Sequence, residues 1–264
     1  MKSGVLNLVL KRLGIAAITL LIVLFAVFFA TSMLPGDTAS ILLGQAATPE
    51  AVAGLREAMH LNDPAILRFL LWLVGLLHGD LGTSYANEMP VAALIGGRLL
   101  NTMKLAGITT LLSVPLALTL GITAAMLRGS VYDRTVTILS IGVISAQMIR
   151  MTRAAVIETL STPYVEMALL KGASRSRMVL RHALPNALGP IVNAVALSLS
   201  YLVGGVIIVE TIFNYPGIAK LMVDAVATRD LPLIQSCAMI FCLGYLFLIT
   251  AADVVAIMSN PRLR

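Results

Sequence analysis

Charged residues are scarce in this chain. Only 12% of its 264 residues are Asp, Glu, Lys or Arg, whereas soluble globular domains carry roughly 25%. Apolar residues make up 58% of the sequence, and the mean hydropathy is +0.93. Such a chain cannot present a polar surface to water on all sides, which excludes a water-soluble globule. The composition is that of an integral membrane protein.

Sequence motifs that bind nucleotides or metals, or that carry a catalytic serine, are also missing. There is no G-x-x-x-x-G-K-[ST] loop, no H-E-x-x-H, no C-x-x-C and no G-x-S-x-G. The histidines, His60, His78 and His182, are too dispersed to share a metal ion. Cys237 and Cys242 lie five apart in one apolar run, which fits packing better than a disulfide or a metal site. We therefore expect no enzymatic activity, no metal and no cofactor in this chain.

Four apolar runs reach the roughly 20 residues that a helix needs to cross a bilayer. They cover residues 13–34, 105–127, 187–209 and 233–257. Their apolar residues do not alternate with polar ones, which favours spanning helices over membrane strands. The predicted fold is an all-α integral membrane protein with a single transmembrane domain over residues 1–264.

Basic residues indicate how the chain is oriented. Lys2, Lys11 and Arg12 precede the first run, so we expect residues 1–12 in the cytoplasm and residues 35–100 outside. A cleaved signal peptide is the alternative for this start, but the run is long and no clear A-x-A site follows it. The net charge of +6 reflects the same insertion bias. No nucleic-acid partner is expected.

The long extracytoplasmic region contains two local signals. Thr48 followed by Pro49 predicts the N-terminus of a helix. The apolar residues 65–78 are too few to span comfortably. We expect them to lie along the outer interface, with Trp72 near the headgroups.

The apolar stretch 135–149 conflicts with this topology. Its length as a helix is only about 22 Å, short of a hydrocarbon core of about 30 Å. A single crossing would also place the basic residues 150–182 outside, against the charge bias. An even number of crossings is therefore required, and the chain is too short for two. We hypothesise that sequence is missing between Ser145 and Gln147, which a measured intact mass near 28.0 kDa would contradict.

Residues 164–185 look soluble within this apolar chain. We predict a short helix over 164–171, a break at Gly172, a second short helix over 173–182 and a stop at Pro185. The second helix would present Arg175, Arg177 and Arg181 on one face and Met178 and Leu180 on another. From spacing alone, the segment is either a solvated loop with insertion charges or a knob that docks on a protein.

The spacing of Glu166, Ala168, Gly172, Leu184 and Pro185 resembles the E-A-A-x3-G-x9-I-x-L-P motif of ABC importer inner-membrane permeases. The resemblance covers nearly the whole chain and is strongest to the peptide/nickel subfamily, the dipeptide and oligopeptide permease B type. Met167 and His182 depart from the general motif. Family members also carry a further stretch of chain at the suspected junction. The stretches that resemble the subfamily are 151–154, 181–186, 204–217 and 229–232.

This resemblance implies an ABC importer permease fold with six transmembrane helices in the intact chain, one pair being partly missing near residue 146. It implies a multi-pass protein of a bacterial or archaeal inner membrane that forms half of a pathway for peptides or a related small solute. Nickel chelates, opines and glutathione are also substrates within the subfamily. The implied partners are two ATP-binding subunits that hold ATP and magnesium, a homologous second permease and an extracytoplasmic binding protein. Residues 211–232 resemble the gate-side segment near which that protein docks.

The coupling segment, residues 150–185, is implied to contact the ATP-binding subunits. The residues implied to couple are Glu166, Ala168, Gly172, Ala173, Ser174, Arg175, Arg177, Leu184 and Pro185. The alternative functions are a secondary transporter and a membrane scaffold that recruits a cytoplasmic protein. The sequence shows no convincing inverted repeat and almost no charge in the middle of a span, which disfavours the secondary transporter.

A polar stripe follows one face of the third run. Asn193, Ser200 and Gly204 recur at helical spacing, with Tyr201 and Gly205 adjacent. Such a stripe lines a pathway or marks tight helix packing. Glu210 and Asp253 are costly against lipid, so we expect each to face a cavity or a partner, a purely structural role being the alternative. We include Glu210 with the pathway residues.

Overall fold

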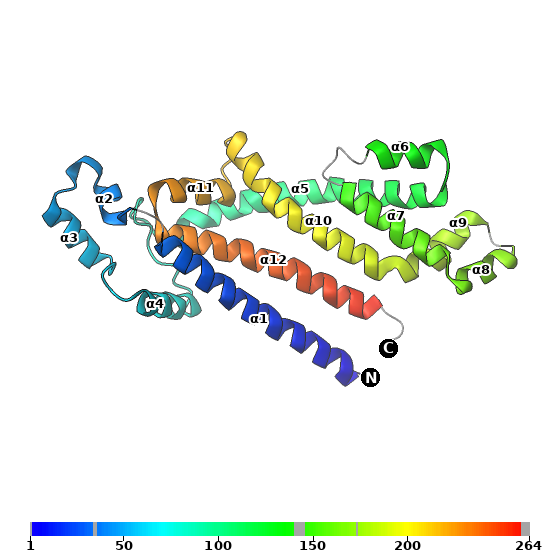
Figure 1. Cartoon of the computed structure of the whole chain (residues 1–264), viewed down its shortest axis with the longest axis horizontal. Helices are drawn as coiled ribbons and strands as arrows, with labels where there is room; N and C mark the ends of the chain where they lie inside the picture. Colours follow the sequence, from blue (N-terminus) through cyan, green and yellow to red (C-terminus); the bar gives the residue numbers. More distant parts are fainter. Residues whose placement is uncertain (1, 34–35, 140–145, 173, 260–264) are drawn as a thin grey trace. The chain divides into compact units, whose positions relative to one another are not determined.

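The chain is almost entirely helical. A computed structural model describes residues 2–33, 36–139, 146–172 and 174–259. Within these ranges the only extended pairing is an isolated bridge between Thr83 and Pro90, so the predicted all-α fold is confirmed. The elements in Figure 1 are α1 (Lys2–Ser32), α2 (Thr38–Leu43), the 3-10 turn η1 (Gly44–Ala46), α3 (Pro49–Ala58), α4 (Ala65–Leu77), α5 (Val91–Met126), α6 (Val131–Leu139), α7 (Ala146–Leu160), α8 (Pro163–Leu170), α9 (Arg175–Arg177), the π turn η3 (Met178–Ala183), α10 (Leu184–Ile212), α11 (Ile218–Thr228) and α12 (Leu231–Ser259).

The chain divides into two compact units. The first unit consists of Met1–Ile15, Ala106–Val203 and Tyr245–Arg264, and the second of Ala16–Leu105 and Gly204–Gly244. Every boundary falls inside one of the long helices α1, α5, α10 and α12.

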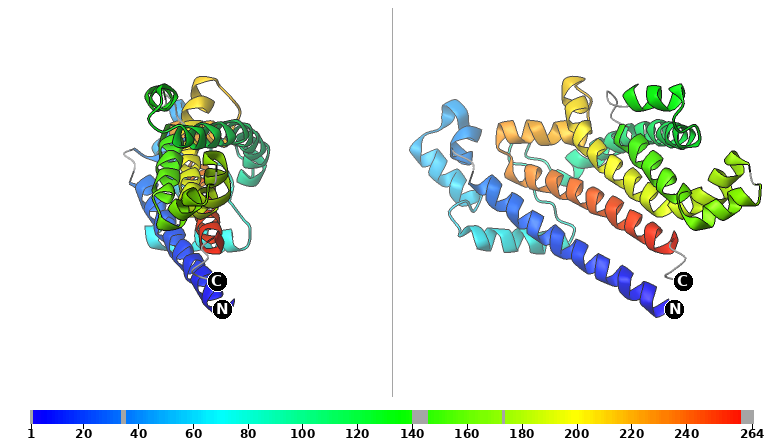
Figure 2. Two further views of the ribbon diagram at one scale, coloured as in Figure 1. Left: turned by 90° about the vertical axis from the view of Figure 1, so that its right-hand side faces the viewer. Right: turned by 45° about the vertical axis from the view of Figure 1, so that its right-hand side comes forward.

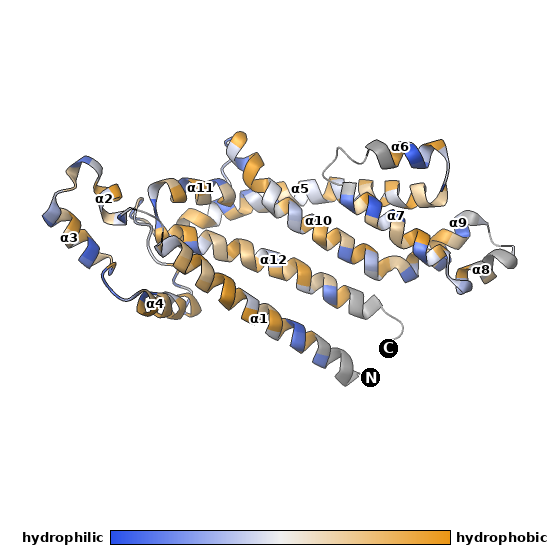
Figure 3. Ribbon diagram, viewed as in Figure 1, coloured by the Kyte–Doolittle hydropathy of each residue, from blue (hydrophilic) through white to orange (hydrophobic). Residues whose placement is uncertain are grey.

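The candidate membrane spans lie on these four helices, and the third span begins earlier, in η3. By length and apolar composition the spans are Val9–Ser32, Val91–Met126, Met178–Ile212 and Leu231–Val255. They overlap the four predicted runs, so the prediction of spanning helices is confirmed. Figure 3 shows apolar residues along most of each long helix and a hydrophilic stretch near the start of α1. In the sequence, that stretch contains Lys11 and Arg12.

Two apolar clusters hold the second unit together. One cluster joins α5, α11 and α12 through buried residues that include Ile95, Leu221 and Leu233. The other joins α1, α4 and α12, where the rings of Phe28 and Phe69 meet edge-on with centroids 5.4 Å apart. The turn between α4 and α5 and the turn between α11 and α12 are then fixed to each other by hydrogen bonds.

Asp230 makes that connection. Its carboxylate is fully buried and accepts hydrogen bonds from the Ser84 hydroxyl and from the backbone of Tyr85 and Ala86. Burial raises the pKa of Tyr85, and the nearby Asp230 carboxylate acts in the same direction. The sequence placed Asp230 in the stretch 229–232 that resembles the subfamily, but it did not reveal these partners, because the contact joins residues more than 140 positions apart.

The helix start predicted at Thr48 is confirmed. The Thr48 hydroxyl accepts a hydrogen bond from the Ala51 backbone at 3.2 Å, and Pro49 begins α3. The next helix, α4, has 13 residues and extends about 20 Å. It is therefore too short to span a bilayer, as expected. In Figures 1 and 2 it lies beside the last turns of α1, in agreement with the contact between Phe28 and Phe69.

The first unit is built from close helix crossings. α5, α7, η3 and α10 share a cluster of buried residues in which small side chains such as Ala125, Ala155 and Ala187 recur. Where α5 crosses α7, a Cβ added to Gly121 would lie 2.9 Å from the Thr152 Cβ and 3.0 Å from the Ile149 carbonyl oxygen. Small residues permit this approach.

The stretch 135–149 does not form one helix. α6 ends at Leu139 and α7 begins at Ala146, while residues 140–145 lie outside the described residues. Ser145 of the suspected junction is among them. α7 continues to Leu160, so the basic segment begins as a regular helix rather than as a loop.

Candidate functional site

The segment between α7 and α10 reverses direction near Gly172. α8 ends at Leu170, and Gly172 has φ +78°, a conformation that favours glycine. α9 begins at Arg175 and continues through η3 into α10 without a break. The predicted arrangement of helix, glycine and helix is confirmed.

The predicted stop at Pro185 is wrong. Proline has no N–H to donate to the carbonyl of Arg181, which would normally interrupt a helix. Here the helix widens into a π turn, in which the Leu184 N–H donates to the Val179 carbonyl five residues earlier. The Asn186 side chain also donates to the His182 carbonyl at 3.0 Å. The proline therefore lies in the first turn of α10, and the helix continues.

Residues 163–172 and 174–183 form a small packed body that we call the knob. The Tyr164 hydroxyl lies 3.2 Å from His182 Nδ1, and the two rings meet edge-on with centroids 5.9 Å apart. Val165 and Val179 are completely buried. η3 also contacts α7. Sequence analysis missed the contact between Tyr164 and His182, because their proximity depends on the chain reversal at Gly172.

The outer surface of the knob mixes apolar and basic groups. Met167 and Leu180 are each 55% exposed. Lys171, Arg177 and Arg181 are exposed as well. The predicted apolar face of Met178 and Leu180 is wrong, since Met178 is buried; residues two apart on a helix point to different sides.

The predicted coupling residues fall on the knob and the start of α10. Among those whose burial is described, Leu184 is half-buried. The exposed ones are Gly172, Ser174, Arg177 and Pro185. Ala173 lies outside the described residues. The side chains of Glu166, Ala168 and Arg175 also lie outside them, and their backbone belongs to α8 and α9.

An ion pair attaches α7 to the start of α6. Arg153 donates from Nε to Asp133 Oδ1 at 2.6 Å and from Nη2 to Asp133 Oδ2 at 2.8 Å. The Asp133 side chain is only 6% exposed and that of Arg153 29%. The hydrogen bond from Arg153 holds the pKa of Asp133 below its ordinary value. This pair fixes the helix on which the knob packs.

The predicted pathway residues lie along α10 with different exposure. Asn193, Tyr201 and Gly204 are exposed, and Ser200 and Gly205 are half-buried. The Ser200 hydroxyl donates to the Ala196 carbonyl within its own helix at 2.8 Å. None of these contacts identifies a bound solute, so a role in the pathway stays a prediction.

A largely apolar cavity of about 340 Å³ lies in the first unit between α5, α7 and α10. Ser113 and Ser198 line it, and their hydroxyls have no hydrogen-bond partner within the described part of the chain. Ser198 precedes Ser200 by two residues, which is about 200° around the helix. The cavity therefore lies on the face of α10 opposite Ser200.

Glu210 is completely buried and binds the N-terminus of α11. Its carboxylate accepts hydrogen bonds from the Thr102 hydroxyl at 2.6 Å and from the backbone of Ala219 at 2.8 Å and Lys220 at 3.1 Å. Gly217 leaves the space for it, since an added Cβ would lie 2.0 Å from Glu210 Oε1. These contacts give Glu210 the structural role that sequence analysis left open. Asp253 likewise has a partner, Arg12, at 3.1 Å.

No group of three or more His, Cys, Asp and Glu residues in the described ranges is arranged to hold a metal ion. The comparisons with known proteins point to transport instead. Residues 89–264 match the model of the family described as the binding-protein-dependent transport system inner membrane component. Residues 5–106 match the model of the N-terminal part of such components. The chain belongs to this family. It is an ABC transporter permease and a multi-pass protein of the inner membrane.

Curated relatives resemble the permease over its whole length. It is 30% identical to a probable peptide ABC transporter permease protein of Sinorhizobium fredii, covering 97% of this chain and 98% of the relative. It is 31% identical to the glutathione transport system permease proteins of Salmonella choleraesuis and Escherichia coli K12, covering 98% of this chain and 99% of each relative.

The permease is shorter than these relatives. The alignment to the Sinorhizobium protein extends over 308 positions, whereas the permease has 264 residues. At least 44 aligned positions therefore have no counterpart in this sequence. The difference agrees in size with a helical hairpin, since two crossings need about 20 residues each.

Proposed function

We propose that this permease forms one half of the translocation pathway of an ATP-driven importer, and that the knob receives the motion of an ATP-hydrolysing subunit. The observation that carries the proposal is the knob itself, a body with its own buried contacts and an exposed surface of apolar and basic side chains. In the proposed topology it lies in the cytoplasm, because the basic residues of the chain favour that side.

The knob has the properties of a docking element. Met167 and Leu180 supply apolar surface that would be removed from water in an interface. The exposed Arg177 and Arg181 can pair with acidic groups of the partner. Because Val165 and Val179 are buried, the knob is held against α7 and the base of α10, and displacement of the knob would displace these helices.

The partners follow from the family. We expect two ATP-binding subunits that hold ATP and magnesium, a homologous second permease, and an extracytoplasmic binding protein that docks near residues 35–100 and 211–232. The chain itself would have no enzymatic activity. In the pathway, Asn193, Ser200, Tyr201 and the glycines Gly204 and Gly205 would face the solute or the second permease.

The proposed substrate is a peptide or a related small solute. The relatives named above are a probable peptide permease and glutathione permeases, and glutathione is itself a short peptide. Identification of the ligand that copurifies with the cognate binding protein would test this part of the proposal. A ligand without a peptide bond would overturn it.

Substitution of Gly172 tests the coupling role. Gly172→Ala strains a residue at φ +78° and would tilt the knob, so we expect ATP hydrolysis to continue while solute uptake by the reconstituted complex falls severalfold. Gly79→Ala is the matched control, because Gly79 has φ +81° and equally open surroundings but lies far from the knob in sequence. Normal uptake by Gly172→Ala would refute the coupling role.

Copurification distinguishes the alternatives. An ATPase pair and a second permease bound to this chain would support the importer. Uptake that follows an ion gradient and needs no ATP would instead indicate a secondary transporter. A cytoplasmic partner without any transport would indicate a scaffold.

A further inference from the structure

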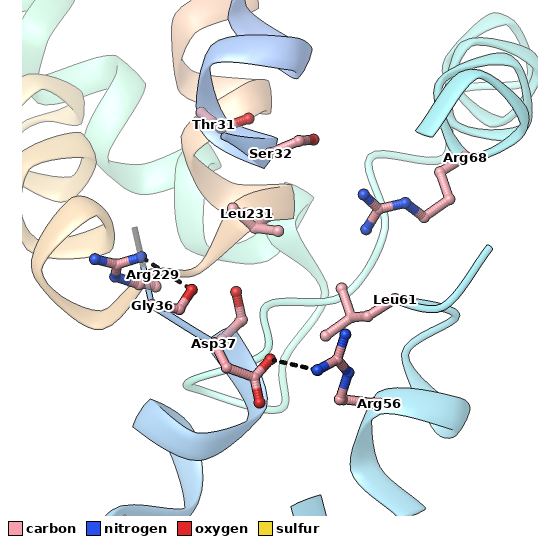
Figure 4. A pocket seen from close by; sticks show the side chains of 10 residues that line it. Thr31, Ser32, Gly36, Asp37, Arg56, Leu61, Arg68, Arg229 and Leu231 are labelled. Carbon is pink, nitrogen blue, oxygen red and sulfur yellow. Dashed lines mark hydrogen bonds and ion pairs between the residues drawn. The ribbon is translucent and has the colours of Figure 1, made fainter. Parts of the chain in front are cut away.

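A polar cavity of about 280 Å³ lies in the second unit, and arginines dominate its lining. Figure 4 shows Arg56 and Arg68 on one side of it and Arg229 beside Gly36 on the other. Among the described residues, Asp37 is the only carboxylate that lines it. With three guanidinium groups and one carboxylate, the lining carries two unbalanced positive charges.

The three arginines are unequally engaged. Arg56 donates from Nε to the Asn62 side chain at 3.2 Å and lies 3.8 Å from Asp37. Arg229 donates to the Gly36 carbonyl at 3.4 Å, so the contacts to Asp37 and Gly36 are long. Arg68 has no carboxylate partner among the described residues, and its Nε is buried without a hydrogen bond there. Its guanidinium carbon lies 6.0 Å from the centre of the Phe28 ring. A buried guanidinium N–H without a partner needs an acceptor, and an anion would supply one together with the opposite charge.

The cavity lies at the ends of two candidate membrane spans. The candidate span of α1 ends at Ser32 and that of α12 begins at Leu231, and both residues line the cavity. The ends of spans mark the edge of the hydrocarbon layer, where the phosphates of lipid headgroups lie. The cavity is therefore at headgroup depth.

The helix that carries Arg68 adds a surface for acyl chains. Ile66, Leu70 and Leu71 of α4 are each at least half exposed, whereas Phe69 packs inward against α1. A helix with one apolar face and a cationic side chain at its margin is typical of the membrane interface. The helix α4 therefore carries both an exposed apolar surface and one of the arginines that line the cavity.

We propose that this cavity binds the phosphate of a phospholipid headgroup, with Arg68 as its principal donor and the acyl chains along the exposed face of α4. The planar guanidinium group matches the geometry of phosphate oxygens. In the topology proposed above, the lipid belongs to the outer leaflet. An acidic side chain of a docking protein would satisfy the charge, but it would leave the apolar face of α4 in water.

Photocrosslinking can test the site on the complete importer complex purified in detergent. The probe is a phosphatidylglycerol with a photoactivatable group in one acyl chain, and the readout is the amount of crosslinked peptide from residues 64–79. We expect Arg68→Gln and Arg229→Gln to reduce this crosslinking at least tenfold and Arg68→Lys to restore part of it. Arg150→Gln is the matched control, because Arg150 is an exposed arginine of the first unit.

Each outcome decides for or against the lipid site. Loss of crosslinking in Arg68→Gln but not in Arg150→Gln supports it. Equal crosslinking in all variants overturns it, as does equal loss in Arg150→Gln, which would reflect total charge alone. If glycerol 3-phosphate abolishes crosslinking of the lipid probe at the same concentration as unlabelled lipid, the acyl chains add nothing to binding. The site then binds a free phosphate and the lipid proposal is overturned. If Arg68→Gln weakens only the binding protein's affinity and leaves crosslinking unchanged, the occupant is that protein.

Discussion

Replacement of Glu210 should release the N-terminus of α11. Glu210→Ala removes the acceptor of two backbone N–H groups, from Ala219 and Lys220, and of the Thr102 hydroxyl. Because Glu210 is 0% exposed, water does not replace the lost acceptor unless the helix moves. The expected change is local opening of α11.

The size of the effect follows from the contacts. A buried donor left without its acceptor costs about 1–3 kcal/mol, so the loss of the acceptor for two backbone N–H groups should cost about 3–5 kcal/mol, the middle of the summed range. Glu210→Gln should cost less, about 1–2 kcal/mol, because its amide oxygen can still accept from the backbone N–H groups while its NH₂ group donates to the Thr102 hydroxyl.

Hydrogen exchange of the α11 amides in the purified permease measures this opening. At about 1.4 kcal/mol per tenfold change, Glu210→Ala should accelerate exchange on the order of 100- to 3,000-fold. Gly217→Ala should resemble it, because its Cβ would displace the carboxylate. Asp224→Asn is the control, since Asp224 is exposed and its ion pair with Lys220 is worth little.

Exchange within about twofold of the wild type in folded Glu210→Ala and folded Gly217→Ala would contradict this role of Glu210.

Two further predictions concern the first unit. Gly121→Ala should lower the free energy of unfolding by about 1–3 kcal/mol, because the new methyl group meets Thr152. Gly107→Ala is the control and should not lower it, because the space around Gly107 is open. Equal thermal midpoints of unfolding for the two variants would contradict the close crossing of α5 and α7. Asp133→Asn should remove a stabilisation that depends on pH. Since Arg153 lowers the folded-state pKa of Asp133, the wild-type advantage should be complete above pH ~4 and disappear as the pH falls through that lowered pKa, whereas Asp133→Asn should show no such step in denaturation between pH 7 and 3.

Local signals predicted the secondary structure well. The start of α3 at Pro49 and the break at Gly172 depend on single residues whose backbone preferences act locally. The predicted stop at Pro185 failed because the effect of proline depends on what the preceding turn can accommodate, and here a π turn keeps the helix continuous.

The candidate sites were harder to predict. Glu210 was singled out because a carboxylate in an apolar run is costly, but its partners come from α5 and α11 and were not visible in the sequence. Tyr164, His182 and the three arginines of the lipid cavity share no local pattern. Their proximity arises only when distant segments pack.

The sequence by itself determined the membrane environment, the helical class and the family, because these depend on summed hydrophobicity and on spacings along one chain. Only the tertiary structure decided which polar groups are paired. Hydrogen bonds and ion pairs act over about 3–4 Å. The roles of Glu210, Asp230 and Arg153 therefore depend on segments that are separated in the sequence and are brought into contact by the fold.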